Sequence, residues 1–286
     1  MTPRFLFLPA LALALVLTGC DAVGDTSSSA TAEDLEDAAG AIAEAVALDA
    51  GGALDDAASM SVALGTDASL SGDGDDMPDR PGCDASRTYD DSGTWNVSIA
   101  CERGNPDGRF YHAFAREATW RFLDADGNPQ EGARGATTIE HDLLSGTGTH
   151  LTPRASAVLE SLTSSITIET AGEDLVTVNG TYDRDGIHTV FGRGEAQREV
   201  DFDLSLTMED ITGPRGRRDR WAGAVSGTLS GVYTATVTAT APNGDTRTRE
   251  VEREFTVTFP NEAERRARIA VGDRVYDADP VTGELL

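Results

Sequence analysis

VDFDLSLTM, residues 200–208, alternates apolar and polar side chains along its whole length. Val200, Phe202 and the apolar residues that follow them share one face, while Asp201 and Asp203 lie on the other. Successive side chains of a β-strand point to opposite faces of the sheet. The stretch therefore predicts a strand of an antiparallel sheet with one buried face and one solvated face.

The same period of two recurs in much of the chain after Cys83. It is regular over residues 232–240 and 250–259, and less regular over residues 94–101, 109–123, 136–144, 162–170, 174–182, 187–191, 222–230 and 268–276. Turn signals at hairpin spacing lie between these segments at Asp126-Gly127-Asn128, Asp185-Gly186 and Asn243-Gly244. We therefore predict an all-β domain over residues 83–286, an antiparallel meander of about 10–12 strands that forms a barrel or a sandwich.

The segment ahead of this domain has a helical period instead. Leu35, Ala39, Ile42 and Val46 recur at steps of three and four residues, which places them on one face of a helix. Thr31 is a suitable N-cap, and the acidic residues that follow it suit the positive end of the helix dipole. We predict a helical segment over residues 31–64 that begins with a short amphipathic helix. We favour packing on the β domain over binding of a partner, and residues 53–64 are compatible with a further helix or a strand.

Acidic residues are concentrated ahead of the β domain. Residues 20–80 contain fifteen Asp and Glu but a single arginine, and residues 65–82 have the composition of an acidic linker. This pattern predicts a solvated spacer. The whole chain has 23 basic and 49 acidic residues and a formal net charge of −26. Such a charge argues against nucleic acid as a partner, because phosphate binding needs a positive surface.

The first residues have the order of a secretory leader. Arg4 precedes an apolar run from Phe5 to Leu17. At about 1.5 Å per residue, this run is too short to span a bilayer core of about 30 Å as a helix. We therefore predict a signal peptide over residues 1–19.

The run ends in Leu17-Thr18-Gly19-Cys20, which resembles the lipobox of bacterial lipoproteins. The resemblance implies that the leader is cut before Cys20 and that this cysteine is diacylated on sulfur. Two or three acyl chains give a stable membrane anchor, so residues 20–30 are expected to form a lipidated tether in the bacterial cell envelope. An acid such as Asp21 resembles an inner-membrane retention signal in some bacteria and accompanies export to the cell surface in others, so the choice of membrane stays open.

Two cysteines remain after the expected lipidation. Cys83 and Cys101 form an even pair in an oxidising compartment, which predicts a disulfide. Closing a loop of just under twenty residues stabilises a fold by about 3 kcal/mol. The alternatives are two free thiols or half of a metal site. The chain has no CxxC motif of the kind that metal sites use.

No residue pattern of a known catalytic site occurs. There is no GxSxG, no P-loop and no GxGxxG after a strand. The four histidines, His112, His141, His150 and His188, form neither an HxH nor an HExxH pattern. We therefore expect no catalytic residues, no metal and no cofactor.

One basic cluster stands out from the acidic background. Arg215, Arg217, Arg218 and Arg220 lead into Trp221. Guanidinium groups bind carboxylate or phosphate in bidentate fashion, and a tryptophan ring can stack on a guanidinium or a sugar. The favoured interpretation is that these arginines neutralise neighbouring acids, and the alternative is a contact site for an anionic partner.

Together these features predict a membrane-anchored envelope lipoprotein with a structural or protein-interaction domain and no enzyme activity. The alternative is a β-barrel that carries or senses a small apolar ligand. That function requires an apolar interior space of several hundred Å³.

Overall fold

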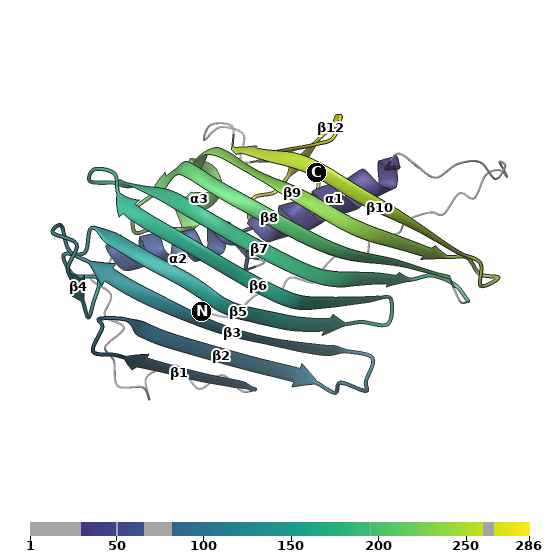
Figure 1. The fold of residues 1–286 in the computed structure, drawn as a ribbon, viewed down its shortest axis with the longest axis horizontal. Helices are drawn as coiled ribbons and strands as arrows, with labels where there is room; N and C mark the ends of the chain where they lie inside the picture. The colour runs from purple at the N-terminus through teal and green to yellow at the C-terminus, as the bar shows by residue number, and fades with distance from the viewer. Residues whose placement is uncertain (1–29, 50, 66–81, 195, 260–265) are drawn as a thin grey trace.

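A single antiparallel sheet dominates the computed structural model, which describes residues 30–49, 51–65, 82–194, 196–259 and 266–286. Its twelve strands follow the order β1-β2-β3-β5-β6-β7-β8-β9-β10-β11-β12, with the short β4 paired to β3 (Figure 1). Because neighbours in the chain are neighbours in the sheet, the predicted meander is confirmed. The sheet is open, with β1 and β12 at its two edges, so a closed barrel is not formed.

Except for β4, β11 and β12, the strands are longer than the average strand of a globular protein. They are β1 (Cys83–Tyr89), β2 (Trp95–Gly104), β3 (Tyr111–Leu123), β4 (Pro129–Gln130), β5 (Thr138–Leu151), β6 (Ala155–Thr170), β7 (Leu175–Phe191), β8 (Gln197–Pro214), β9 (Ser226–Thr240), β10 (Thr246–Phe259), β11 (Ala267–Val271) and β12 (Arg274–Ala278).

The alternating stretch at residues 200–208 forms the middle of β8, as predicted. Leu204 lies between Arg184 of β7 and Tyr233 of β9 in the sheet register. Val200 and Leu204 are buried and the intervening Asp201 and Asp203 are exposed. Period-two patterning therefore placed the correct side chains on the buried face of this strand.

Two local expectations were wrong. The predicted turn at Asp185-Gly186 lies inside β7, which continues without a break. A Cβ at Gly186 would lie 2.3 Å from the carbonyl oxygen of Val158. This glycine therefore allows β6 to approach β7 closely and does not mark a turn. The predicted strand at residues 222–230 begins in the helix α3 (Arg218–Ala224) and becomes β9 only from Ser226.

Two N-terminal helices cover one face of the sheet, which we call the inner face (Figure 1). They are α1 (Ala32–Val46) and α2 (Ala53–Gly65), and together with the sheet they share one apolar core. Ile42, Leu54 and Met60 have no exposed surface. Each such side chain stabilises the fold by about 1.5–3 kcal/mol. The favoured packing of the amphipathic helix on the β domain is thus confirmed.

Most acids of these helices do not form part of a solvated spacer, because they pair with arginines. Asp34 of α1 accepts from Arg198 of β8 and Arg249 of β10, each at 2.9 Å. Glu44 of α1 lies 3.2 Å from Arg184 of β7. The spacer prediction was wrong for this segment because arginines on the inner face of the sheet neutralise the helix acids. Most of the predicted linker at residues 65–82 lies outside the described residues.

Candidate functional site

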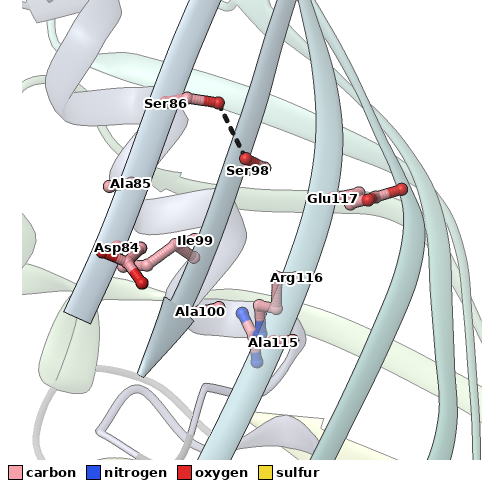
Figure 2. Close-up of a pocket in the computed structure, with 9 residues that line it drawn as sticks. All are labelled: Asp84, Ala85, Ser86, Ser98, Ile99, Ala100, Ala115, Arg116 and Glu117. Carbon is pink, nitrogen blue, oxygen red and sulfur yellow. Dashed lines mark hydrogen bonds between the residues drawn. The ribbon is translucent and has the colours of Figure 1, made fainter. Parts of the chain in front are cut away.

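A shallow hollow of about 340 Å³ lies over β1, β2 and β3, near one edge of the sheet (Figure 2). Its lining comprises Asp84, Ala85, Ser86, Ser98, Ile99, Ala100, Ala115, Arg116 and Glu117. The Ser86 and Ser98 hydroxyl oxygens are 2.8 Å apart, as the dashed line in Figure 2 marks. Small side chains from three adjacent strands therefore leave this space open.

Most of this lining belongs to the outer face, away from the helices. Arg116 points to the inner side, since its guanidinium donates to the Gly51 carbonyl oxygen at 2.8 Å. Side chains alternate along a strand, so Glu117 points outward, and the register pairs it with Ser98 and Ser98 with Ser86. This hollow therefore combines hydroxyl groups with the carboxylates of Asp84 and Glu117.

The hollow presents hydrogen-bonding side chains rather than a catalytic group. Each serine hydroxyl is bonded to the other, and the lining contains no histidine to activate it as a nucleophile. Hydroxyl and carboxylate oxygens accept hydrogen bonds and favour positively charged groups. The hollow can bind a polar or cationic group, but it does not supply an activated nucleophile.

The disulfide predicted between Cys83 and Cys101 is confirmed. The two residues lie directly opposite each other in the β1–β2 ladder. The bond joins the edge strand β1 to β2, next to the hollow. It therefore holds the edge strand β1 against β2.

The basic cluster is largely engaged with the chain itself. Arg215 donates to the Leu64 carbonyl oxygen at 2.9 Å, and Arg217 pairs with Asp219 at 2.9 Å. Arg218 forms a short hydrogen bond to Asp55 and also reaches Asp49 at 3.5 Å. These contacts agree with the favoured interpretation that the arginines neutralise neighbouring acids.

Trp221 does not have the predicted stacking role. Its side chain has no exposed surface, and its indole Nε1 donates to the Pro214 carbonyl oxygen at 3.0 Å. A Cβ on Gly213 would lie 2.6 Å from the ring, so the indole fills a space that this glycine leaves. Trp221 is a packing residue, and a contact with an anionic partner stays a prediction for the exposed Arg217 and Arg220.

The histidines lie on β3, β5 and β7, and β6 separates β5 from β7 in the sheet. His112 and His150 are paired across β3 and β5, with ring centroids 5.7 Å apart. His188 is on β7, and His141 is buried beside Trp120. Burial lowers the pKa of His141 to about 4. Within the described ranges, no group of three or more His, Cys, Asp or Glu side chains is placed to hold a metal ion.

Sequence reasoning missed a nearly buried carboxyl between α2 and the sheet. The Asp56 side chain is 13% exposed, and its Oδ1 lies 3.6 Å from the Arg116 guanidinium. Its Oδ2 has no hydrogen-bond partner among the described residues. Burial raises the pKa of Asp56 to about 7, against the opposing effect of Arg116. The sequence did contain one signal for it. By period two, Arg116 lies on the same face of its strand as the apolar residues Ala118 and Phe122, and a buried arginine needs an acidic partner.

Replacing Asp56 with asparagine is expected to flatten the pH dependence of stability. From about pH 4 to pH 7 the native Asp56 holds a proton that the unfolded chain releases, so wild-type stability falls as the pH rises. Relative to the wild type, Asp56→Asn should gain about 2–3 kcal/mol between pH 5 and pH 8. Urea unfolding at both pH values measures this difference. The exposed Asp91→Asn is the charge-matched control, and a difference that does not change with pH would contradict the prediction.

Comparison with protein-family models, with curated proteins and with solved structures finds no match to this chain. No helix in the described part of the chain combines the length and the apolar character needed to cross a membrane.

Proposed function

We propose that this chain is a lipid-anchored protein of the bacterial cell envelope whose open sheet is a structural or protein-interaction module. The anchor rests on Arg4, the apolar run to Leu17 and the lipobox-like ending at Cys20. Residues 1–29 lie outside the described residues, so the sequence alone supports this part of the proposal.

The interaction role rests on the difference between the two faces of the sheet. The inner face is occupied by α1 and α2. On the outer face, β8, β9 and β10 present a regular array of threonines and acids, among them Asp201, Thr234 and Glu252. A long, hydrogen-bonded sheet holds such an array in fixed positions. This surface suits contact with another macromolecule.

Transport of an apolar ligand is less well supported. A carrier would need apolar space on the inner face of the sheet. Side chains from both helices, including Ile42 and Met60, pack there without exposure. We therefore favour the interaction module over the carrier.

Replacing Cys20 with serine tests the anchor. The variant should lose palmitate labelling and leave the membrane fraction, because the acylated sulfur is removed. Radiolabelled palmitate incorporation and membrane sedimentation measure the two effects. The double variant Cys83→Ser/Cys101→Ser is the matched control and should remain labelled, since it keeps Cys20. A Cys20→Ser protein that still sediments with membranes would disprove anchoring through this residue.

A further inference from the structure

One end of the sheet carries an arginine at each of four hairpin turns. The meander places the β2–β3, β5–β6, β7–β8 and β9–β10 turns at the same end. The arginines in or beside these turns are Arg109, Arg154, Arg193 and Arg247, and all four are exposed. None of them has an ion-pair partner among the described residues.

Acids are fewer in these four turns than in three of the turns at the opposite end. Asp107 and Asp245 are the acids in the described parts of these four turns. The opposite end has Asp90 and Asp91, Asp124 and Asp126, and Glu173 and Asp174 in the β1–β2, β3–β4 and β6–β7 turns. In the described parts of these four turns the arginines outnumber the acids by four to two, so the turns carry a positive charge on a chain whose net charge is −26.

Large apolar side chains are exposed beside these arginines. Phe110 is 67% exposed next to Arg109, and Val190 and Phe191 are 46% and 40% exposed at the end of β7. The backbone N–H of Phe191 donates to the Arg154 carbonyl oxygen at 2.9 Å, so two of the turns are adjacent. We call the four arginines, Phe110, Val190 and Phe191 the arginine rim.

The first helix begins at the same end. Asp34, in the first turn of α1, contacts Arg198 close to the start of β8 and Arg249 close to the start of β10. Ten residue-to-residue steps lead from Cys20 to Ala30. Fully extended, they reach at most about 35 Å. Because β7 has 17 residues, the opposite end of the sheet lies more than 50 Å further along, at roughly 3.3 Å per residue.

We propose that the arginine rim docks on the lipid bilayer that holds the anchor, with its arginines at anionic headgroups and its phenylalanines in the interface. This proposal rests on the proposed lipidation of Cys20 and adds an orientation to it. Exposed Phe side chains bury at the boundary between headgroups and acyl chains, and arginines near an anionic surface strengthen binding. The sheet then stands away from the membrane, with the acidic turns at its far end.

Depth-dependent fluorescence quenching in the acylated protein tests the orientation. Tryptophan is placed at the rim in Phe110→Trp and Phe191→Trp, and Val275→Trp is the control because Val275 is 62% exposed on β12, away from the rim. The proteins are reconstituted in vesicles containing about one third phosphatidylglycerol and brominated lipids. Brominated chains should quench the added rim tryptophans and leave the Val275→Trp signal unchanged. Equal quenching at all three positions, or none at the rim, would overturn the proposal.

A second arm separates the rim from the anchor. Leaderless protein carrying Cys20→Ser is sedimented with the same vesicles without brominated lipid. Arg154→Glu/Arg193→Glu should weaken binding about 25-fold or more, at about fivefold for each lost arginine. Arg268→Glu/Arg274→Glu, which has the same charge change at exposed positions of β11 and β12 away from the rim, should have no such effect. If both double variants weaken vesicle binding equally, the effect is one of net charge, and the proposal that the rim docks on the bilayer is wrong.

The two proposals fail differently. If Cys20 takes up no palmitate, the anchor is wrong, but the second arm still measures docking by the rim. If Cys20 is acylated and the rim tryptophans are not quenched, the anchor stands and the orientation is wrong.

Discussion

Replacing Asp34 with alanine is expected to destabilise the protein by about 3–5 kcal/mol. The Asp34 side chain has no exposed surface and is shared by Arg198 and Arg249 at 2.9 Å each. It also accepts from the backbone N–H and the hydroxyl of Thr31, which form a capping box at the start of α1. Its removal leaves two guanidinium groups without their common partner and frees the first turn of the helix.

Urea unfolding of the variant measures this loss. Glu36→Ala removes an exposed acid from the same helix and should change stability by no more than about 0.5 kcal/mol. Asp34→Asn retains an acceptor for Thr31 but loses the charge. Its loss of stability should lie between that of Asp34→Ala and that of Glu36→Ala. A loss below about 1 kcal/mol for Asp34→Ala would show that the ion pairs do not hold the helix to the sheet.

The same carboxyl gives an acid limit to stability. Burial alone would raise the pKa of Asp34, but hydrogen bonds from Arg249, Thr31 and Arg198 lower it to about 2. Its stabilising contribution is therefore present above about pH 4 and is lost as the pH falls towards 2.

Replacing Trp221 with alanine should cost about 3–5 kcal/mol. The indole is fully buried, against Gly213, and its removal leaves a cavity in the apolar core. The variant also leaves the Pro214 carbonyl oxygen without the indole donor at 3.0 Å. Because α3 carries this residue, its attachment to the end of β8 should weaken along with global stability.

Conservative and exposed substitutions separate packing from hydrogen bonding at Trp221. Trp221→Phe keeps an aromatic ring and should lose about 1 kcal/mol for the missing donor. Phe110→Ala changes a 67% exposed aromatic and should have almost no effect on thermal or urea unfolding. A Trp221→Ala protein as stable as the wild type would show that the indole is not a core residue.

Local patterns were sufficient to predict much of the sheet. The alternation in residues 200–208 and 250–259 placed the buried side chains of β8 and β10 on the correct face. Cys83 and Cys101 were paired by elimination, and the ladder of β1 and β2 brings them opposite each other. Strand alternation depends on residues close in the chain, and the cysteine pairing left very few alternative partners.

Charge placement was harder to predict. Arg198 is in phase with Val200 and Phe202, yet a lone arginine in an apolar phase does not identify its partner. That partner, Asp34, is 164 residues away. Arg217 and Arg218 pair with neighbouring acids, as the favoured interpretation of the arginine cluster expected, but the burial of Trp221 depended on a packing site that its local sequence does not show.

By itself, the sequence determined the antiparallel meander, the capped first helix and the disulfide, because strand period, N-cap chemistry and cysteine number are local or nearly so. Tertiary structure decided that the sheet stays open, that α1 and α2 fill its inner face, and that the helix acids meet the arginines of distant strands. Those outcomes depend on which surfaces pack together, and the free energy of packing and ion pairing is shared between segments far apart in the chain.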